Sequence, residues 1–160
     1  MNAVASPKRS PKRKPSFGDL TPGECRALLA RHHVGRLAYT FHDRVDIAPI
    51  NYVYSRRSLV LRTAPGSKLE TIAHHPWVAL EIDEVDGAFD WRSVVVHGTA
   101  YILRRSGNPA DVRSHAAAVK SLRRLLPETF RRGDPVPFRS VVVKLHIDRM
   151  TGRFARTGQR

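Results

Sequence analysis

The sequence has a single cysteine, Cys25, and no uninterrupted apolar run long enough to cross a membrane. One cysteine cannot form an intramolecular disulfide, and it excludes a zinc site built from several thiolates. A transmembrane helix needs about 20 apolar residues, so none is expected. The basic N-terminal residues are not followed by the apolar segment of a secretory signal. We therefore expect a protein of a reducing, cytoplasmic setting.

The common nucleotide-binding signatures are also missing. The chain contains neither G-x-x-x-x-G-K nor G-x-G-x-x-G, which argues against a Walker-type phosphate loop and a dinucleotide-binding fingerprint. Strands and helices do not alternate regularly along the chain, so a doubly wound parallel sheet is not expected. Four of the eight histidines occur as two adjacent pairs at expected helix ends, a spacing that does not predict a metal site.

Acidic residues are scarce: 14 stand against 28 basic ones, which gives a formal charge of +14. Most of the excess lies at the ends, because residues 1–16 contain five basic residues and residues 149–160 contain four, with no acid in either segment. Proline and like charges in residues 1–16 are typical of a disordered tail. We therefore predict a basic tail at 1–16, one folded domain at 17–148 and a basic C-terminal tail at 149–160.

Three helices and six strands are expected in the folded domain. Thr21 and Glu24 form a capping box around Pro22, which predicts a helix over 21–33. Pro49 indicates an interrupted, bulged or edge strand, and Gly98 indicates a bulge. Residues 84–90 are expected to form an acidic loop. The remaining expected elements are strands at 34–41, 46–54, 58–63, 77–83, 91–103 and 138–147, and helices at 67–74 and 109–126. This order predicts a mainly β fold with helical additions, namely a small antiparallel barrel of six strands.

The segment from Arg62 to Lys68 carries the clearest chemical signal. A strand ends there, a turn with Gly66 follows, and a helix begins at Ser67. Backbone N–H groups at such a turn form an anion-binding nest, to which two cations and the hydroxyl of Thr63 add. The pattern therefore predicts a phosphate site, with a capped turn bearing solvated charges as the alternative.

Four segments in the same order identify a family. They are VGRLAY (34–39), IAPINYVY (47–54), LVLRTAPGSKLETIAHHPWVALEID (59–83) and WRSVVVHGTA (91–100). Together they resemble the pyridoxamine 5′-phosphate oxidase-like flavoproteins, the FMN-binding split barrels that include small nitroimidazole-resistance-type members. The resemblance implies a homodimer of six-stranded split barrels, with FMN in the groove between the subunits.

The resemblance also implies roles for particular residues. The phosphate of FMN would be held by Arg62, Thr63, Gly66, Ser67 and Lys68. The strand along the isoalloxazine would contribute Pro49, Ile50, Asn51 and Tyr52, and a strand near the flavin and the subunit interface would contribute Trp91, Ser93, Val94 and Gly98. Taken from the residues alone, Asn51 is equally compatible with a strand-end turn, and the rings of Tyr52 and Trp91 with barrel core or dimer contact.

The expected function is that of an FMN-dependent oxidoreductase acting on a small acceptor. The family's vitamin B6 oxidases carry a C-terminal substrate segment rich in Arg, Pro and Trp, whereas this chain ends MTGRFARTGQR, so oxidation of vitamin B6 is not expected. The sequence singles out no catalytic acid or base. Two alternatives remain open: a split barrel that binds a deazaflavin coenzyme or haem, and a basic nucleic-acid-binding module. For the basic helix near residue 120, few aromatic residues lie nearby, which favours a solvated face.

Overall fold

The structure is a computed structural model that describes residues 14–158. Seven strands and three helices are formed within this part of the chain. Their order is β1 (Pro15–Asp19), α1 (Pro22–Arg31), β2 (Val34–Phe41), β3 (Arg44–Ser55), β4 (Ser58–Thr63), α2 (Ser67–His74), β5 (Trp77–Gly87), β6 (Asp90–Leu103), α3 (Pro109–Leu125) and β7 (Val141–Thr157). No helix among these residues is long and apolar enough to cross a membrane.

Six strands close into a ring. The strand order is β7-β4-β3-β2-β5-β6, and β6 pairs again with β7, so the sheet returns to its first strand. Every pairing is antiparallel. The core inside the ring is built from alternating strand residues such as Leu37, Leu59, Leu61, Leu80 and Leu145, all with no exposed surface. This confirms the expected six-stranded antiparallel barrel.

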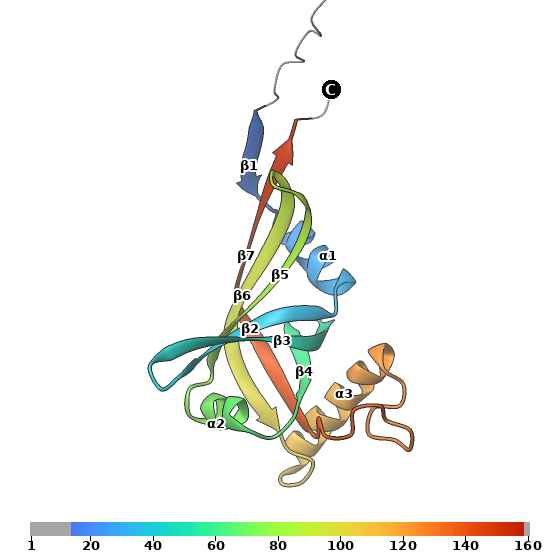
Figure 1. Cartoon of the computed structure of the whole chain (residues 1–160). Helices are drawn as coiled ribbons and strands as arrows, with labels where there is room; N and C mark the ends of the chain where they lie inside the picture. The colour runs from blue at the N-terminus through green and yellow to red at the C-terminus, as the bar shows by residue number, and fades with distance from the viewer. Residues whose placement is uncertain (1–13, 159–160) are drawn as a thin grey trace, which may run out of the picture.

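The ring is split, because β7 has different neighbours along its length. Its residues 141–146 pair with β4 and its residues 153–157 pair with β1, while β6 pairs with residues between 142 and 155. Strand β5 contacts β2 only around Leu80 and then continues with β6 alone. The outer parts of β5, β6 and β7, together with β1, form an arm that rises from the barrel in Figure 1.

Helix α1 fills the angle between the arm and the barrel. Its buried residues Cys25, Leu28 and Leu29 join the barrel core. Gly152 on β7 permits this approach, since a Cβ there would lie 2.5 Å from the Cys25 sulfur. The helix begins as the sequence predicts: the Thr21 hydroxyl accepts from the Glu24 N–H, and the Glu24 carboxylate accepts from the Thr21 N–H.

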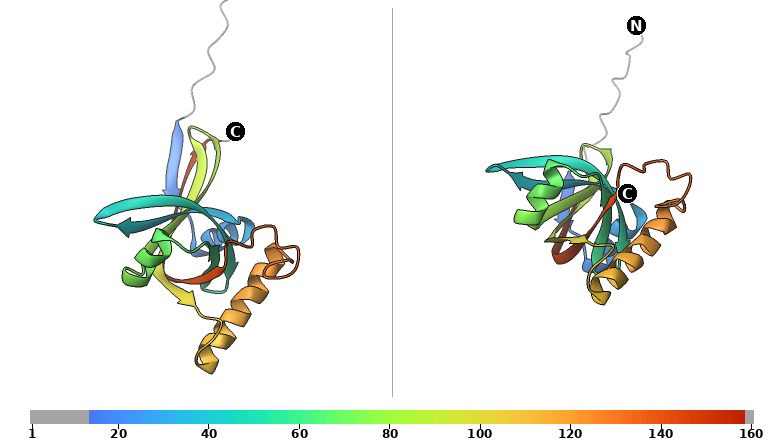
Figure 2. Two further views of the ribbon diagram at one scale, coloured as in Figure 1. Left: turned by 60° about the horizontal axis from the view of Figure 1, so that its bottom comes forward. Right: turned by 90° about the horizontal axis from the view of Figure 1, so that it is seen from below.

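Helices α2 and α3 lie on different sides of the barrel, as both views in Figure 2 show. Helix α3 covers the outer face of β3, β4 and β7. There Ala118, Val119 and Leu122 pack against Val53 and Val60 in a second, smaller apolar cluster. Both faces of β4 are therefore covered, and all six of its residues are buried. The connection from α3 to β7, residues 126–140, continues over this same outer face.

The expected tails need correction. Pro15 and Ser16 belong to β1, while residues 1–13 lie outside the described part of the chain. The segment from Arg149 to Thr157, expected to be a flexible tail, is the second half of β7. Phe17 pairs with Ala155 across the two strands, so a ladder between distant segments replaces the disorder that local composition predicts. The last strand also begins at Val141 rather than at Phe138.

The structure also differs from, or agrees with, the sequence at the β5–β6 turn, at Pro49 and at Gly98. The acidic loop at 84–90 is wrong, because β5 runs to Gly87 and β6 starts at Asp90, which leaves a two-residue turn. Pro49 does not interrupt β3; it pairs with Arg36 on one side, and β4 begins to pair only at Tyr52, so its missing N–H faces a free edge. The bulge at Gly98 is confirmed by the register shift between His97 and Gly98.

Candidate functional site

The four residues expected along the isoalloxazine lie on β3, and their side chains point alternately to its two faces. Successive side chains of a strand alternate, so Ile50 and Tyr52 point into the barrel and are buried, whereas Pro49 and Asn51 are exposed. Tyr52 has no exposed surface, and its hydroxyl donates to the Leu29 carbonyl at 3.0 Å. Burial raises the pKa of Tyr52. Its ring is barrel core, which is the alternative that the residues alone left open.

Arg62 lies on the outer face of β4, beside Asn51. Its guanidinium is engaged by the connection between α3 and β7. Nη1 and Nη2 donate to the two oxygens of Asp134 at 3.1 and 2.6 Å, Nη2 also donates to the Val136 carbonyl at 3.1 Å, and Nε donates to the Arg139 carbonyl. The side chains of Arg62 and Asp134 are 6% and 5% exposed. This pair is therefore shut away from solvent.

The carboxylate of Asp134 also has hydrogen-bond partners on both oxygens. Besides the guanidinium, its carboxylate accepts from the backbone N–H groups of Phe130 and Val136 at 2.9 and 3.0 Å. The hydrogen bonds from Arg62, and then those from the backbone, hold the pKa of Asp134 far below its usual range. The Phe130 ring completes the arrangement, with the Arg62 guanidinium carbon 4.2 Å from its centroid. A guanidinium and two N–H groups form an anion site, and the chain fills that site with its own carboxylate.

The start of α2 is open by comparison. Gly66, at the N-cap, has a φ of 145°, a conformation that glycine tolerates far better than other residues. No side chain caps this helix end, and an added Cβ at Gly66 would meet nothing within 4 Å. The N–H groups of Leu69 and Glu70 donate to the Gly66 carbonyl at 2.9 and 3.1 Å, which leaves the N–H groups of Ser67 and Lys68 without an acceptor inside the helix. Ser67 is exposed and Lys68 half-buried, while Thr63 is buried and its hydroxyl donates to the Ala64 carbonyl at 3.4 Å.

Lys68 has a different surrounding from Arg62. Its Nζ lies 5.9 Å from the centroid of the Tyr39 ring, and the Tyr39 hydroxyl donates to Asp46 at 2.7 Å. Burial, and then this hydrogen bond, raises the pKa of Tyr39 to about 12. The same bond is the main reason that the pKa of Asp46 is lowered, and the Lys68 charge lowers it further. Within residues 14–158 no hydrogen bond or ion pair links Lys68 with Arg62.

Arg62 and Lys68, the two cations expected to bind one phosphate, thus have separate partners. An FMN phosphate would fit the open start of α2, where first-turn N–H groups, the Ser67 hydroxyl and the Lys68 ammonium can converge on an anion. It would not fit Arg62 in this arrangement, because four hydrogen bonds occupy the guanidinium and only 6% of the side chain is exposed. The structure therefore brings Asn51 and Arg62 together on one face but leaves Arg62 without a free donor fork.

Trp91 and Ser93 lie on the arm, apart from Asn51. Trp91 pairs across the strands with Val85 and Ala155, and the Ser93 hydroxyl donates to Glu81 at 2.8 Å. Val94 is buried inside, and Gly98 sits at the bulge. The strand partners of this segment are β5 and β7, and the Ser93 hydroxyl bonds to β5, so its described pairings do not include β3 or β4. One chain alone therefore does not assemble all of the residues expected around the flavin.

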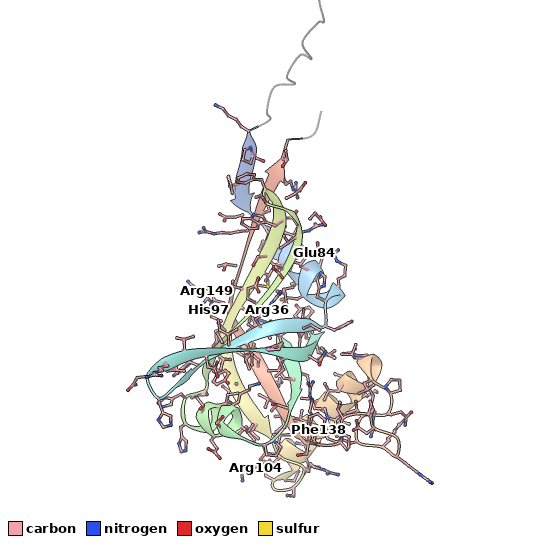
Figure 3. The ribbon with its side chains drawn as sticks, in the orientation of Figure 1. Arg36, Glu84, His97, Arg104, Phe138 and Arg149 are labelled. Atoms are coloured by element: carbon pink, nitrogen blue, oxygen red, sulfur yellow. The ribbon has the colours of Figure 1, made fainter. Side chains whose placement is uncertain are left out.

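A barrel face formed by β2, β3 and β5 carries exposed apolar side chains. Val45 and Ile47 on β3 are 73% and 63% exposed, and Trp77 on β5 is 70% exposed. Two shallow hollows lie on this face; one, of about 350 Å³, is lined by Val45, Trp77 and His97 among others. Figure 3 shows His97 and Arg149 where the arm meets the barrel, and the two residues pair across β6 and β7.

Sequence reasoning missed the residues that surround Arg62 from the far end of the chain. Asp134 and Phe130 lie in a connection that no motif marks, and Arg139 precedes β7. Its Nη1 donates to Asn51 Oδ1 at 2.9 Å. The one local signal is the G-D-P-V-P run at 133–137, since an Asp between Gly and Pro is typical of a tight turn with side-chain to backbone hydrogen bonds. That signal predicts the turn but not its partner on β4.

Comparison with known proteins places this geometry in a family. A sequence profile described as pyridoxamine 5′-phosphate oxidase matches residues 21–154. The chain belongs to the pyridoxamine 5′-phosphate oxidase family. Within the family it is 33% identical over 144 residues to the uncharacterized protein RA0666 of Rhizobium meliloti (strain 1021), covering 85% of this chain and 93% of that protein.

Two solved structures of similar proteins match most of the chain. An FAD-binding protein from Mesorhizobium loti superposes with a TM-score of 0.67 at 26% identity, covering 86% of this chain and 96% of that one. The FAD-binding protein from Mycobacterium smegmatis gives a TM-score of 0.60 at 27% identity, with 86% and 99% covered. The similarity extends over nearly the whole of both proteins.

Proposed function

We propose that this protein binds a flavin and works as an oxidoreductase that passes electrons to a small acceptor. The observation that carries the proposal is the open start of α2, with Gly66, Ser67 and Lys68, at the end of the strand that follows Asn51 in the barrel. A flavin needs a cation and donors for its phosphate and a polar edge for its ring. Membership of the family and the FAD-binding relatives support the same ligand class.

In this proposal FMN is the cofactor, and its phosphate lies at the start of α2. The first-turn N–H groups and the Ser67 hydroxyl donate to the phosphate, and Lys68 supplies the positive charge. Asn51 and Pro49 on the exposed face of β3 border the ring. When bound, the flavin supplies two-electron chemistry, accepting a hydride equivalent from a donor and releasing it to the acceptor. The protein binds and orients it.

We further propose that the functional unit is a homodimer. The exposed apolar side chains of Val45, Ile47 and Trp77 share one face, and a face of this kind on a soluble protein favours association. A two-fold dimer would use the same face on both chains. It would also explain why Trp91 and Ser93 lie apart from Asn51 in a single chain: the partner subunit would bring its own arm to the site.

FAD is a second candidate for the cofactor. Two of the solved relatives, 26% and 27% identical to this chain, are named for FAD binding. FAD has a pyrophosphate in place of the terminal phosphate of FMN, so its negative charge is spread over two groups. The start of α2 can serve either anion, and chromatography of the flavin released from purified protein separates the two cofactors.

The experiment that tests the proposal is titration with FMN and with riboflavin, which has the same ring but no phosphate. Wild-type protein is expected to bind both, FMN more tightly. Lys68→Met should weaken FMN binding about 10-fold or more, since a hydrogen bond to a charged group is lost, and should leave riboflavin binding unchanged. Lys120→Met, on the exposed side of α3, is the matched control. Wild-type protein that takes up neither FMN nor FAD would refute the proposal.

A further inference from the structure

The connection between α3 and β7 reaches the proposed flavin site through one side chain. Arg139 donates from Nη1 to the Asn51 side-chain oxygen at 2.9 Å, although the two residues are 88 positions apart. Arg139 is half-buried and Asn51 exposed. The neighbouring Phe138 is 61% exposed, and Figure 3 shows it on this connection.

This contact decides which way the Asn51 amide faces. Arginine carries only donors, so the amide atom that meets it must be the oxygen, because the nitrogen would place two donors against each other. With Oδ1 held by Arg139, the two N–H donors of Asn51 are left to point elsewhere. Asn51 therefore presents a donor edge.

A donor edge is what the pyrimidine end of a flavin can use. Its two carbonyl oxygens accept hydrogen bonds, and negative charge gathers at this end when the ring is reduced. A positive charge held nearby stabilises that charge. Arg139 therefore meets both needs, by orienting Asn51 and by bringing a cation to its side chain.

The buried pair of Arg62 and Asp134 explains how an arginine on a loop keeps a fixed place. Arg62 donates to the backbone carbonyls of Val136 and Arg139 as well as to the Asp134 carboxylate. The Phe130 ring lies over the guanidinium, and the backbone N–H of Phe130 donates to the Asp134 carboxylate. Arg62 thus clamps the backbone of the very residue whose side chain reaches Asn51.

We propose that Arg139 is a positioning residue of the flavin site, which turns the Asn51 amide so that it donates to the pyrimidine edge of the ring, and that Arg62 and Asp134 form a clasp that holds Arg139 in place. The inference rests on the proposed flavin function. It assigns Arg62 to the scaffold of the site, in contrast to the phosphate contact implied by family resemblance.

Titration with FMN and riboflavin tests the role of Arg139. Arg139→Met should weaken binding of both ligands by the same factor, about three- to ten-fold for one lost hydrogen bond, because the ring is common to both. It should also lower the reduction potential of bound FMN. Arg139→Lys, which keeps the charge and a donor, should restore much of the potential. Arg132→Met, an exposed arginine of the same connection, is the matched control.

A loss confined to FMN would make Arg139 a phosphate ligand and overturn the inference, as would unchanged affinity and potential for both flavins. Failure of the wild type to bind any flavin would instead overturn the proposed function, and this role with it. The two failures are therefore distinguishable by the wild-type titration alone.

The clasp is tested by Asp134→Asn. If Arg62 belongs to the scaffold, this variant should loosen Arg139 and weaken both flavins, and the double variant with Arg139→Met should be no weaker than Arg139→Met alone. If Arg62 is a phosphate ligand held back by Asp134, the same variant should bind FMN more tightly than wild type, which would overturn the clasp. Arg62→Met combined with Asp134→Leu removes both charges and serves where the single variant does not fold.

Discussion

Gly98 on β6 lies directly against the backbone carbonyl of His146 on β7. A Cβ at position 98 would overlap that carbonyl oxygen and would also touch the Leu145 side chain. The contact occurs at the bulge between His97 and Gly98, where the arm departs from the barrel. The direction of the arm therefore depends on a residue without a side chain at this position.

Gly98→Ala is accordingly expected to destabilise the fold. The methyl group can be accommodated only if β6 and β7 separate, and overpacking of this kind costs roughly 1–3 kcal/mol. The free energy of unfolding from urea titration measures the effect. Gly23→Ala is the control, because its added Cβ would approach only the Thr21 hydroxyl, at 3.9 Å. Equal stability of both variants would contradict the close approach at the bulge.

Glu84 on β5 ties the end of α1 to the arm and predicts a dependence of stability on pH. Burial alone would raise the pKa of this carboxyl. Hydrogen bonds from His32 and Arg31, with the charge of Arg92, outweigh burial and lower the pKa to about 2. Arg31, His32 and Arg92 each approach a Glu84 oxygen to 2.6 Å. Figure 3 shows Glu84 beside α1.

A carboxyl whose pKa is lower in the folded than in the unfolded protein adds stability above the unfolded value, and this is lost as the pH falls toward the folded value. Glu84→Gln should therefore lower the urea midpoint near neutral pH. The difference from wild type should shrink between the ordinary value of 4.5 and about 2. Glu128→Gln, exposed after α3, should show no such change. A constant difference over this range would argue against the cluster.

Cys25 offers a test of the packing of α1. Its side chain is 2% exposed, and burial, with the nearby charge of Glu24, raises the pKa of the thiol. Only the thiolate attacks disulfide reagents readily. The folded protein should therefore react with Ellman's reagent far more slowly than urea-unfolded protein, which provides the control. Rapid reaction of the folded protein would show that α1 separates from β7.

Sequence reasoning succeeded where the determining contacts are local. The capping box of Thr21 and Glu24 spans four residues, and the glycine bulge at Gly98 is marked by the residue itself. The alternation of side chains along a strand also accounts for residues 49–52, of which two are exposed and two are buried. For Tyr52 the residues alone left barrel core open beside the flavin contact implied by the resemblance, and the ring lies in the core.

It failed where a partner lies far along the chain. Proline and charge near residue 15 are typical of a disordered segment. In the structure this segment is a strand, because Pro15 pairs with Thr157 on β7. Arg62 has the surroundings of a phosphate ligand in its own heptapeptide, and only the turn at Asp134, 72 residues later, shows that the guanidinium is already paired. Long-range pairing of this kind leaves no signal in either segment alone.

The exposed apolar face around Ile47 gives the last prediction. If two chains associate through it, purified protein should have twice the 18.0 kDa mass of the chain by light scattering. Ile47→Asp would place two carboxylates in an apolar interface without partners, which is costly, so this variant should have the mass of one chain. It should also lose flavin binding, because the arm of the partner would be absent. Val112→Asp, on the exposed part of α3, tests whether any added charge has this effect. A wild-type protein with the mass of one chain would refute the dimer, and a monomer that still bound flavin would place the whole site within one subunit.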